Sequence, residues 1–152
     1  MKFLIDYTAS IEPKILTYEV EDCSFDTNPS VQWINFDVVV NKLNLTAVDD
    51  DNKIVQLWGF CGLTATMKSN YEVPQHTTGI LKVADNLEGG FAYGVSEEDL
   101  PVYVNIQSGW VCIGDPEKKG DAVEFITNCV AVIDEDKYLV SLWLKPQSLP
   151  SI

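Results

Sequence analysis

The sequence predicts a mainly β protein, either an antiparallel sandwich or a partly closed barrel, with at most one or two short helices. Most apolar runs of the 152-residue chain are short and rich in β-branched and aromatic residues. Glycine, proline, asparagine and aspartate separate these runs, as they do at turns between strands. Little of the chain is left for helices, so we expect a single β-rich domain over residues 1–152.

The apolar runs place the strands along the chain. Alternation in residues 15–20 and 102–107 predicts strands with one face toward water, whereas residues 139–144 are apolar on both faces, as in a central or covered strand. The predicted strands span residues 2–7, 15–20, 31–40, 43–48, 53–61, 77–83, 91–95, 102–107, 110–113, 122–133 and 138–144.

Two short segments have helical features. Residues 63–68 contain alanine, methionine, leucine and lysine, which favour a helix, although the threonines among them do not. Residues 96–99 (SEED) have the form of a capping box, but Pro101 would end such a helix within about one turn. Neither segment is long enough for a layered αβα architecture.

Two stretches of the sequence nearly repeat each other. Residues 47–58 read AVDDDNKIVQLW and residues 131–143 read AVIDEDKYLVSLW. In each, an acidic group separates two strand-like runs, which predicts a hairpin tip because aspartate and asparagine tolerate turn geometry. We expect Trp58 and Trp143, which lie in the second strand of each hairpin, to be in the core.

The charge balance indicates which partners the protein attracts. Its 23 acidic residues face only 10 basic ones, all lysine, and the net charge is −13. Such a surface repels nucleic acids and anionic membranes and attracts cationic partners. The absence of arginine also argues against phosphate binding, which commonly uses guanidinium groups.

The residue types that carry catalysis and metal binding are sparse or badly spaced. The acidic tips do not fit the ligand positions of an EF-hand, and His76 is the only histidine, which we expect in a solvated loop. Four widely spaced cysteines, with no C-x-x-C pair, predict buried free thiols: Cys23, Cys61, Cys112 and Cys129. We therefore expect no metal, no cofactor and no enzymatic activity.

The N-terminus and the hydropathy pattern bear on localisation. The first residues, MKFLIDYTAS, lack the basic and apolar regions of an export signal, and no apolar run is long enough to span a membrane. These features predict a cytoplasmic protein.

Acidic turns combined with aromatic residues predict a protein-binding surface. Aromatic anchors provide binding energy at interfaces, and surrounding charges accelerate association. Trp33 and Trp110 both lie near turns, where core and interface roles are equally compatible with the sequence. The predicted partner-binding residues are Asp49, Asp50, Asp51, Glu97, Glu98, Asp99, Trp110, Asp134, Glu135 and Asp136.

The C-terminal third of the chain resembles a known class of proteins. Residues 108–116 (SGWVCIGDP), 128–132 (NCVAV) and 142–146 (LWLKP) are similar to segments of small bacterial immunity proteins that are encoded beside toxins. The resemblance implies a cytoplasmic protein that neutralises a toxin, although it carries no binding residues over to this chain. With the charge, it leads us to expect a basic toxin, a nuclease domain, whose active site or exosite is occluded.

Two alternatives stay open from the sequence. A partly closed β-barrel would be able to hold a small apolar ligand in its interior. A pair of acidic residues in one cleft would be able to catalyse hydrolysis if their pKa values were pushed apart.

Overall fold

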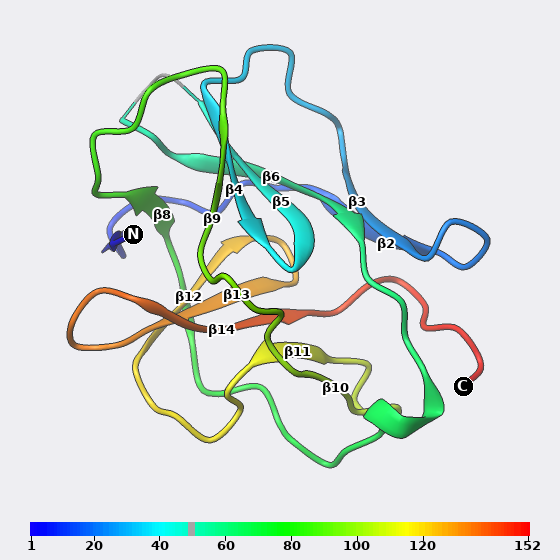
Figure 1. Cartoon of the computed structure of the whole chain (residues 1–152). Coiled ribbons are helices and arrows are strands. Elements are labelled where there is room, and N and C mark those ends of the chain that lie inside the picture. The colour runs from blue at the N-terminus through cyan, green and yellow to red at the C-terminus, as the bar shows by residue number, and fades with distance from the viewer. Residues whose placement is uncertain (49–50) are drawn as a thin grey trace.

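The computed structural model describes residues 1–48 and 51–152, and these residues form a mainly β sandwich (Figure 1). One six-stranded sheet, called the N-terminal sheet, has the strand order β2-β3-β6-β5-β4-β9. Its pairs are antiparallel except β4 with β9. The strands are β2 (Ile15–Glu19), β3 (Ser24–Asn28), β4 (Phe36–Val40), β5 (Lys42–Ala47), β6 (Ile54–Phe60) and β9 (Ala92–Gly94).

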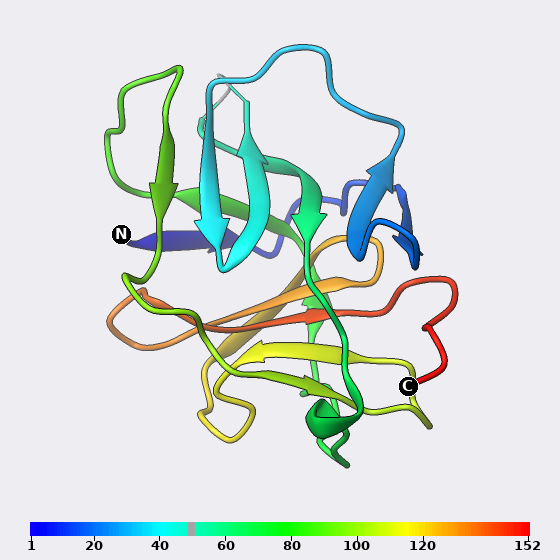
Figure 2. The same ribbon diagram turned by 45° about the vertical axis from the view of Figure 1, so that its right-hand side comes forward.

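The second six-stranded sheet, called the C-terminal sheet, has the order β10-β11-β14-β13-β12-β7. Its pairs are antiparallel except β12 with β7. The strands are β7 (Thr77–Thr78), β10 (Val102–Val104), β11 (Val111–Gly114), β12 (Asp121–Ile126), β13 (Cys129–Ile133) and β14 (Leu139–Leu144). In Figure 2 this sheet lies below the N-terminal sheet, and the strands of the two sheets run in different directions.

A short antiparallel ribbon connects the sheets along one side of the molecule. It consists of β1 (Phe3–Asp6) and β8 (Ile80–Val83), and Figure 2 shows it between the two sheets on the left. The β8 strand contacts both β6 and β12. Phe3 and Leu81 of the ribbon are fully buried, so its apolar side closes that edge of the core.

The main core lies between the two sheets and is built by alternation along their strands. Phe25, Leu45 and Leu57 of the N-terminal sheet share one buried cluster with Phe125 and Leu142 of the C-terminal sheet. Within the described ranges 1–48 and 51–152 the sheets do not close into a barrel. The sandwich is therefore the correct one of the two predicted architectures, and the barrel that was to hold an apolar ligand is not formed.

The outer face of the C-terminal sheet has a second, smaller core. Trp143, Val130 and Cys112 point away from the main core, and Tyr71 and Val73 pack over them. These two residues belong to residues 69–76, which we call the covering segment. The start of its backbone is tied to the sheet, because Ser69 N donates to Val104 O (2.8 Å) and Asn105 Nδ2 donates to Tyr71 O (3.0 Å), and β7, which directly follows it, pairs with β12. The β14 strand is thus central and covered, as its two apolar faces predicted.

Several predicted elements differ from the observed ones. The run 122–133 is two strands joined by a turn, where Asn128 has a left-handed φ of 65°. The run 77–83 is divided at Gly79, whose backbone passes so close to Asp6 O that a Cβ would lie 2.6 Å away. Residues 31–35 are not a strand, because the chain must cross from β3 to β4, which lie on opposite sides of β6 and β5.

Of the two segments predicted as short helices, only the first contains a helical turn. Residues Ala65–Met67 form a 3₁₀ turn (η1) inside the predicted segment 63–68. Residues 96–99 are bends and not a helix, although Glu98 N does donate to Ser96 Oγ (3.3 Å). In the described part of the chain no helix has the length and apolar character needed to cross a membrane.

Candidate functional site

A groove of about 540 Å³ crosses the outer face of the N-terminal sheet, and we call it the aromatic groove. Its floor contains Trp58 and Phe60 of β6, with 42% and 60% of their surface exposed. Ile34, from the crossover between β3 and β4, forms part of its wall and is also more than half exposed. The remaining lining residues are Asp22, Ser24, Phe25, Asp26, Ser30, Val31, Asn44, Thr46, Gln56 and Gly59.

The strand register explains why these side chains meet. Successive residues of β6 alternate between the faces of the sheet, so Leu57 enters the core while Trp58 faces outward. Asp26 of β3 and Asn44 of β5 lie directly opposite Trp58 on its two sides. The groove therefore runs across neighbouring strands that share one fixed register, and not along a loop.

Hydrogen bonds hold the floor of the groove in place. Trp58 Nε1 donates to Thr46 Oγ1 (3.0 Å), and Thr46 Oγ1 donates to Asp37 Oδ1 (2.6 Å). Gln56 Nε2 donates to Thr27 O (2.8 Å), while Gln56 Oε1 accepts the backbone N–H of Val31 (3.1 Å). Since these partners are fixed before any ligand arrives, the groove is preorganised for binding.

Carboxylates stand along the rim on the β3 side. Glu21 and Asp22 are exposed in the β2–β3 turn, where Cys23 has a φ of 51°. Asp26 accepts from Thr27 N (2.9 Å) through Oδ1. Among the described residues that line the groove there is no lysine, although Lys42 of β5 is opposite Phe60 in register. The groove thus combines apolar area with negative charge.

Sequence reasoning missed this site because β3 was not predicted. Ser24, Asp26 and Asn28 face outward and only Phe25 is a large apolar residue facing inward, so the apolar signal of this strand is weak. The signal that was available is the pair Glu21-Asp22 after the alternating run 15–20, which has the same form as the two predicted acidic hairpin tips.

The two tryptophans of the near-repeat have different environments. Trp143 is 1% exposed, as predicted, because the covering segment lies over it. Trp58 was expected in the core, and that expectation is wrong: its ring is at the surface in the aromatic groove. Both indoles point outward from their sheets; the covering segment packs against the cluster of Trp143, whereas the β3–β4 crossover only borders the groove that contains Trp58.

Both acidic stretches of the near-repeat are hairpin tips, as predicted. Val48 N donates to Lys53 O (3.0 Å) across the β5–β6 tip, and Asp134 N donates to Tyr138 O (2.9 Å) across the β13–β14 tip. Asp51 is exposed in the first tip, whereas Asp49 and Asp50 lie outside the described residues.

The β1–β8 ribbon joins the two tips on one side of the molecule. Val83 N donates to Asn52 O (3.1 Å) in the first tip, and Phe3 N donates to Lys137 O (2.8 Å) in the second. The structure therefore brings the two predicted tips to the same side, although 84 positions separate Ala47 from Ala131 in the sequence.

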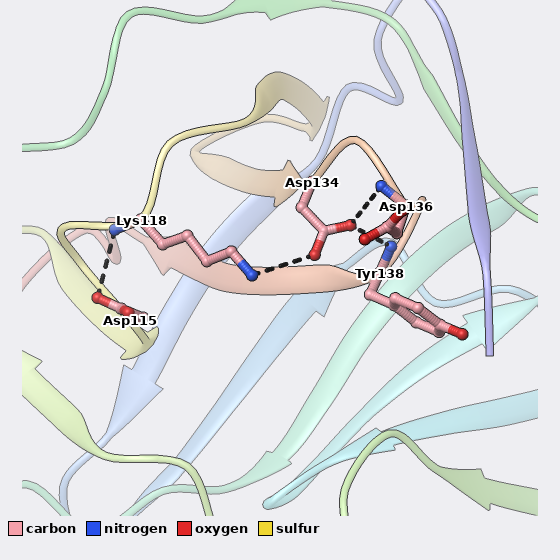
Figure 3. Close-up of polar contacts among 5 residues, drawn as sticks. All are labelled: Asp115, Lys118, Asp134, Asp136 and Tyr138. Carbon is pink, nitrogen blue, oxygen red and sulfur yellow. Dashed lines mark hydrogen bonds and ion pairs between the residues drawn. The ribbon is translucent and has the colours of Figure 1, made fainter.

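Asp134 has a structural role at its tip (Figure 3). Its Oδ1 accepts the backbone N–H groups of Asp136 and Tyr138, both at 2.9 Å, and its Oδ2 is 3.3 Å from Lys118 Nζ. The hydrogen bond from Tyr138, with the contributions of Lys118 and Asp136, lowers the pKa of the Asp134 carboxyl. Glu135 and Asp136 are exposed and remain available to a partner.

Lysines reduce the negative charge near both tips. Lys82 Nζ lies 3.5 Å from Asp51 Oδ2, and Lys118 pairs with Asp134 as described. Lys2 Nζ lies 5.9 Å from the ring centroid of Tyr138, beside the second tip. The net negative charge of the surface around each tip is therefore smaller than the acidic residues of the tip alone would give.

The other predicted residues lie elsewhere. Glu97, Glu98 and Asp99 are exposed beside the β4–β5 turn, where Leu100 N donates to Asn41 Oδ1 (2.7 Å). This is the end of the β4–β5 hairpin opposite the β5–β6 tip, because Val40 pairs with Leu43 there and Phe36 with Ala47 at the other end. The predicted residues thus do not form one continuous surface.

Trp110 is half-buried and lies far along its sheet from the β13–β14 tip. It precedes Val111, which pairs with Leu144, whereas the tip adjoins Leu139 at the other end of β14. Its ring meets that of His76 edge to face, with centroids 6.2 Å apart. His76 is accordingly part-buried and not fully solvated as expected, and its Nδ1 is 2.8 Å from Pro74 O.

The four cysteines are free thiols; Cys61, Cys112 and Cys129 are buried, as predicted, whereas Cys23 is exposed because it lies in the β2–β3 turn and not in an apolar run. Burial raises the pKa of Cys61 to about 11 and that of Cys112 to about 12, and it raises the pKa of Cys129 as well. These thiols are protonated at neutral pH and are poor nucleophiles. Across residues 1–48 and 51–152, no three histidine, cysteine or acidic side chains gather to hold a metal ion.

Comparisons with protein-family models and with curated proteins found no match to this chain.

Proposed function

We propose that this protein is a cytoplasmic, immunity-type inhibitor that binds a basic protein toxin, a nuclease domain, and occludes its active site or an exosite. The observation that carries the proposal is the aromatic groove, in which exposed Trp58 and Phe60 lie beside the carboxylates of Asp22 and Asp26. Buried aromatic anchors with charged neighbours are the usual centre of a tight protein interface.

The charge of the molecule agrees with a basic partner. A nuclease presents lysine and arginine to the phosphates of its substrate. A protein of net charge −13 attracts that surface at long range and accelerates the encounter. Neutralisation then requires only that the bound inhibitor excludes the substrate, with no chemistry on the toxin.

The first test is calorimetric titration with the product of the adjacent reading frame, inactivated where toxic. We expect nanomolar binding in 50 mM NaCl that weakens in 300 mM NaCl, since charged pairs at the rim are screened. A folded partner that releases no heat at either salt concentration would refute the proposal.

The β5–β6 tip supplies a second test of the proposal. Replacing Asp49, Asp50 and Asp51 together by asparagine should slow association several-fold at low salt and leave folding unchanged, because exposed charges act mainly on the association rate. The matched control converts Glu97, Glu98 and Asp99 to their amides, which changes the charge equally at a distant place. Equal slowing in both variants would show that only the net charge matters.

A further inference from the structure

The two outer faces of the sandwich differ in how far their aromatic side chains are covered by other parts of the chain. On the C-terminal sheet, Tyr71 and Val73 of the covering segment pack over Trp143. On the N-terminal sheet, Trp58 and Phe60 occupy similar outward positions but remain 42% and 60% exposed. Leaving two aromatic side chains exposed in one groove forfeits burial energy, which a partner would recover.

We propose that an extended segment of the basic partner fills the aromatic groove, with an apolar side chain over Trp58 and Phe60 and a lysine or arginine at Asp22 and Asp26. The ligand of the groove is then a peptide of alternating apolar and basic residues. This inference takes one element from the proposed function, namely that the partner is positively charged.

The covering segment shows how such a peptide would bind. It packs Tyr71 and Val73 against the cluster that contains Trp143, and its Tyr71 carbonyl accepts a hydrogen bond from the side-chain amide of Asn105 (3.0 Å). The aromatic groove offers an amide as well, that of Asn44 opposite Trp58, whose Nδ2 donates one N–H to Trp58 O (3.4 Å) and carries a second N–H. Residue alternation in an extended peptide then places every second side chain on the floor.

The charges select a basic peptide. Asp26 is opposite Trp58 in register, so a lysine or arginine beside the apolar residue that covers the indole approaches a carboxylate. A second copy of this chain is a poor occupant, because two molecules of net charge −13 repel each other.

The test follows the indole N–H signals of the ¹⁵N-labelled protein during titration with an acetylated, amidated peptide of alternating lysine and leucine, eight residues long. Single Trp→Phe variants assign the signals of Trp33, Trp58, Trp110 and Trp143. The matched probe replaces each lysine by glutamate. Because only a peptide is used, failure here leaves the calorimetric test of toxin binding unaffected.

We expect the lysine peptide to shift the Trp58 signal and leave that of buried Trp143 unchanged. W58L should weaken binding about tenfold, equivalent to about 1.4 kcal/mol, and D26N should weaken it several-fold while keeping the Oδ1 acceptor. An unchanged Trp143 signal shows that each variant is folded. No shift of Trp58 at millimolar peptide, or equal shifts with the glutamate peptide, would overturn the proposal.

Discussion

Asp134 and Asp136 belong to the same turn but have different roles. The Asp134 carboxylate accepts two backbone N–H groups and pairs with Lys118, so its folded-state pKa is below the ordinary value of 3.8. Only the charged form makes these contacts fully, and the contribution is therefore present at neutral pH. It is lost as the pH falls below about 4 and through the lowered pKa.

We therefore predict a pH-dependent difference between wild type and D134N. At pH 7 the variant should unfold at a lower urea concentration, and the gap between the two proteins should narrow as the pH falls below about 4 and through the lowered pKa of Asp134. D136N is the matched control, because it removes one negative charge from an exposed side chain in the same tip. A gap that stays constant down to pH 2 would contradict the assigned role of the Asp134 charge.

The same substitution should lower the stability of the protein by different amounts at the two tryptophans. W143A removes a fully buried ring, and we expect a loss of about 3–5 kcal/mol in the free energy of unfolding. W58A removes a ring that is 42% exposed and should cost less than about half as much. Urea unfolding of both variants measures this difference. Equal losses would mean that the outer face near Trp58 is covered in solution.

The tryptophans also show what the sequence is able to predict about single residues. Each indole follows a leucine in the second strand of an acidic hairpin, so the local pattern is the same. The difference arises from residues 69–76, which are remote from both hairpins and pack over only one of the sheets. Local sequence therefore predicted the strands around each tryptophan but not which indole is buried.

Within the β6 strand, Gly59 permits close contact with its neighbour β5. Its φ is 136°, and a Cβ at this position would lie 2.4 Å from Lys42 O. We predict that G59A costs about 1–3 kcal/mol, because the strand must move or adopt a strained conformation. The control is G62A, where nothing lies within 4 Å of the added Cβ. Similar unfolding midpoints for the two variants would refute this explanation.

Strands were predicted where apolar residues alternate or run together, and most of those predictions hold. The exceptions follow from contacts outside the local pattern. The β3 strand has polar residues outward and a buried threonine inward, Thr27, whose Oγ1 is satisfied by donating to Leu57 O (2.9 Å). Local sequence does not show that hydrogen-bond partner, so the segment is predicted as a loop. For the same reason the acidic turn before it was not recognised as a hairpin tip.

Across the whole molecule, negative charge opposes folding. The net charge of −13 is compensated locally by few close ion pairs among the described residues, at Lys53, Lys82 and Lys118. Raising NaCl from about 0.01 M to 0.1 M shortens the screening length from about 30 Å to about 10 Å. We predict that the urea midpoint rises over this range, and that the rise is smaller in the triple-asparagine variant of residues 49–51. A falling midpoint would show that the ion pairs dominate.

The charge of the chain predicts a cationic partner, but it does not predict where on the molecule such a partner would bind. Lysines lie close to both predicted tips, whereas the described lining of the aromatic groove has none. Composition does not contain this distribution, since it depends on which strands are neighbours in the sheet. The strand order β2-β3-β6-β5 places Asp26 beside Trp58, and no local pattern indicates that order.

The bond from Phe3 N to Lys137 O has a consequence for synthesis on the ribosome. The β1 strand leaves the ribosome well before the β13–β14 turn that it contacts. At about 5–20 residues per second, the roughly 130 residues between them take on the order of ten seconds to translate. During that time Phe3 has no completed core to enter, so the sandwich acquires its native form only after the β13–β14 hairpin has been made.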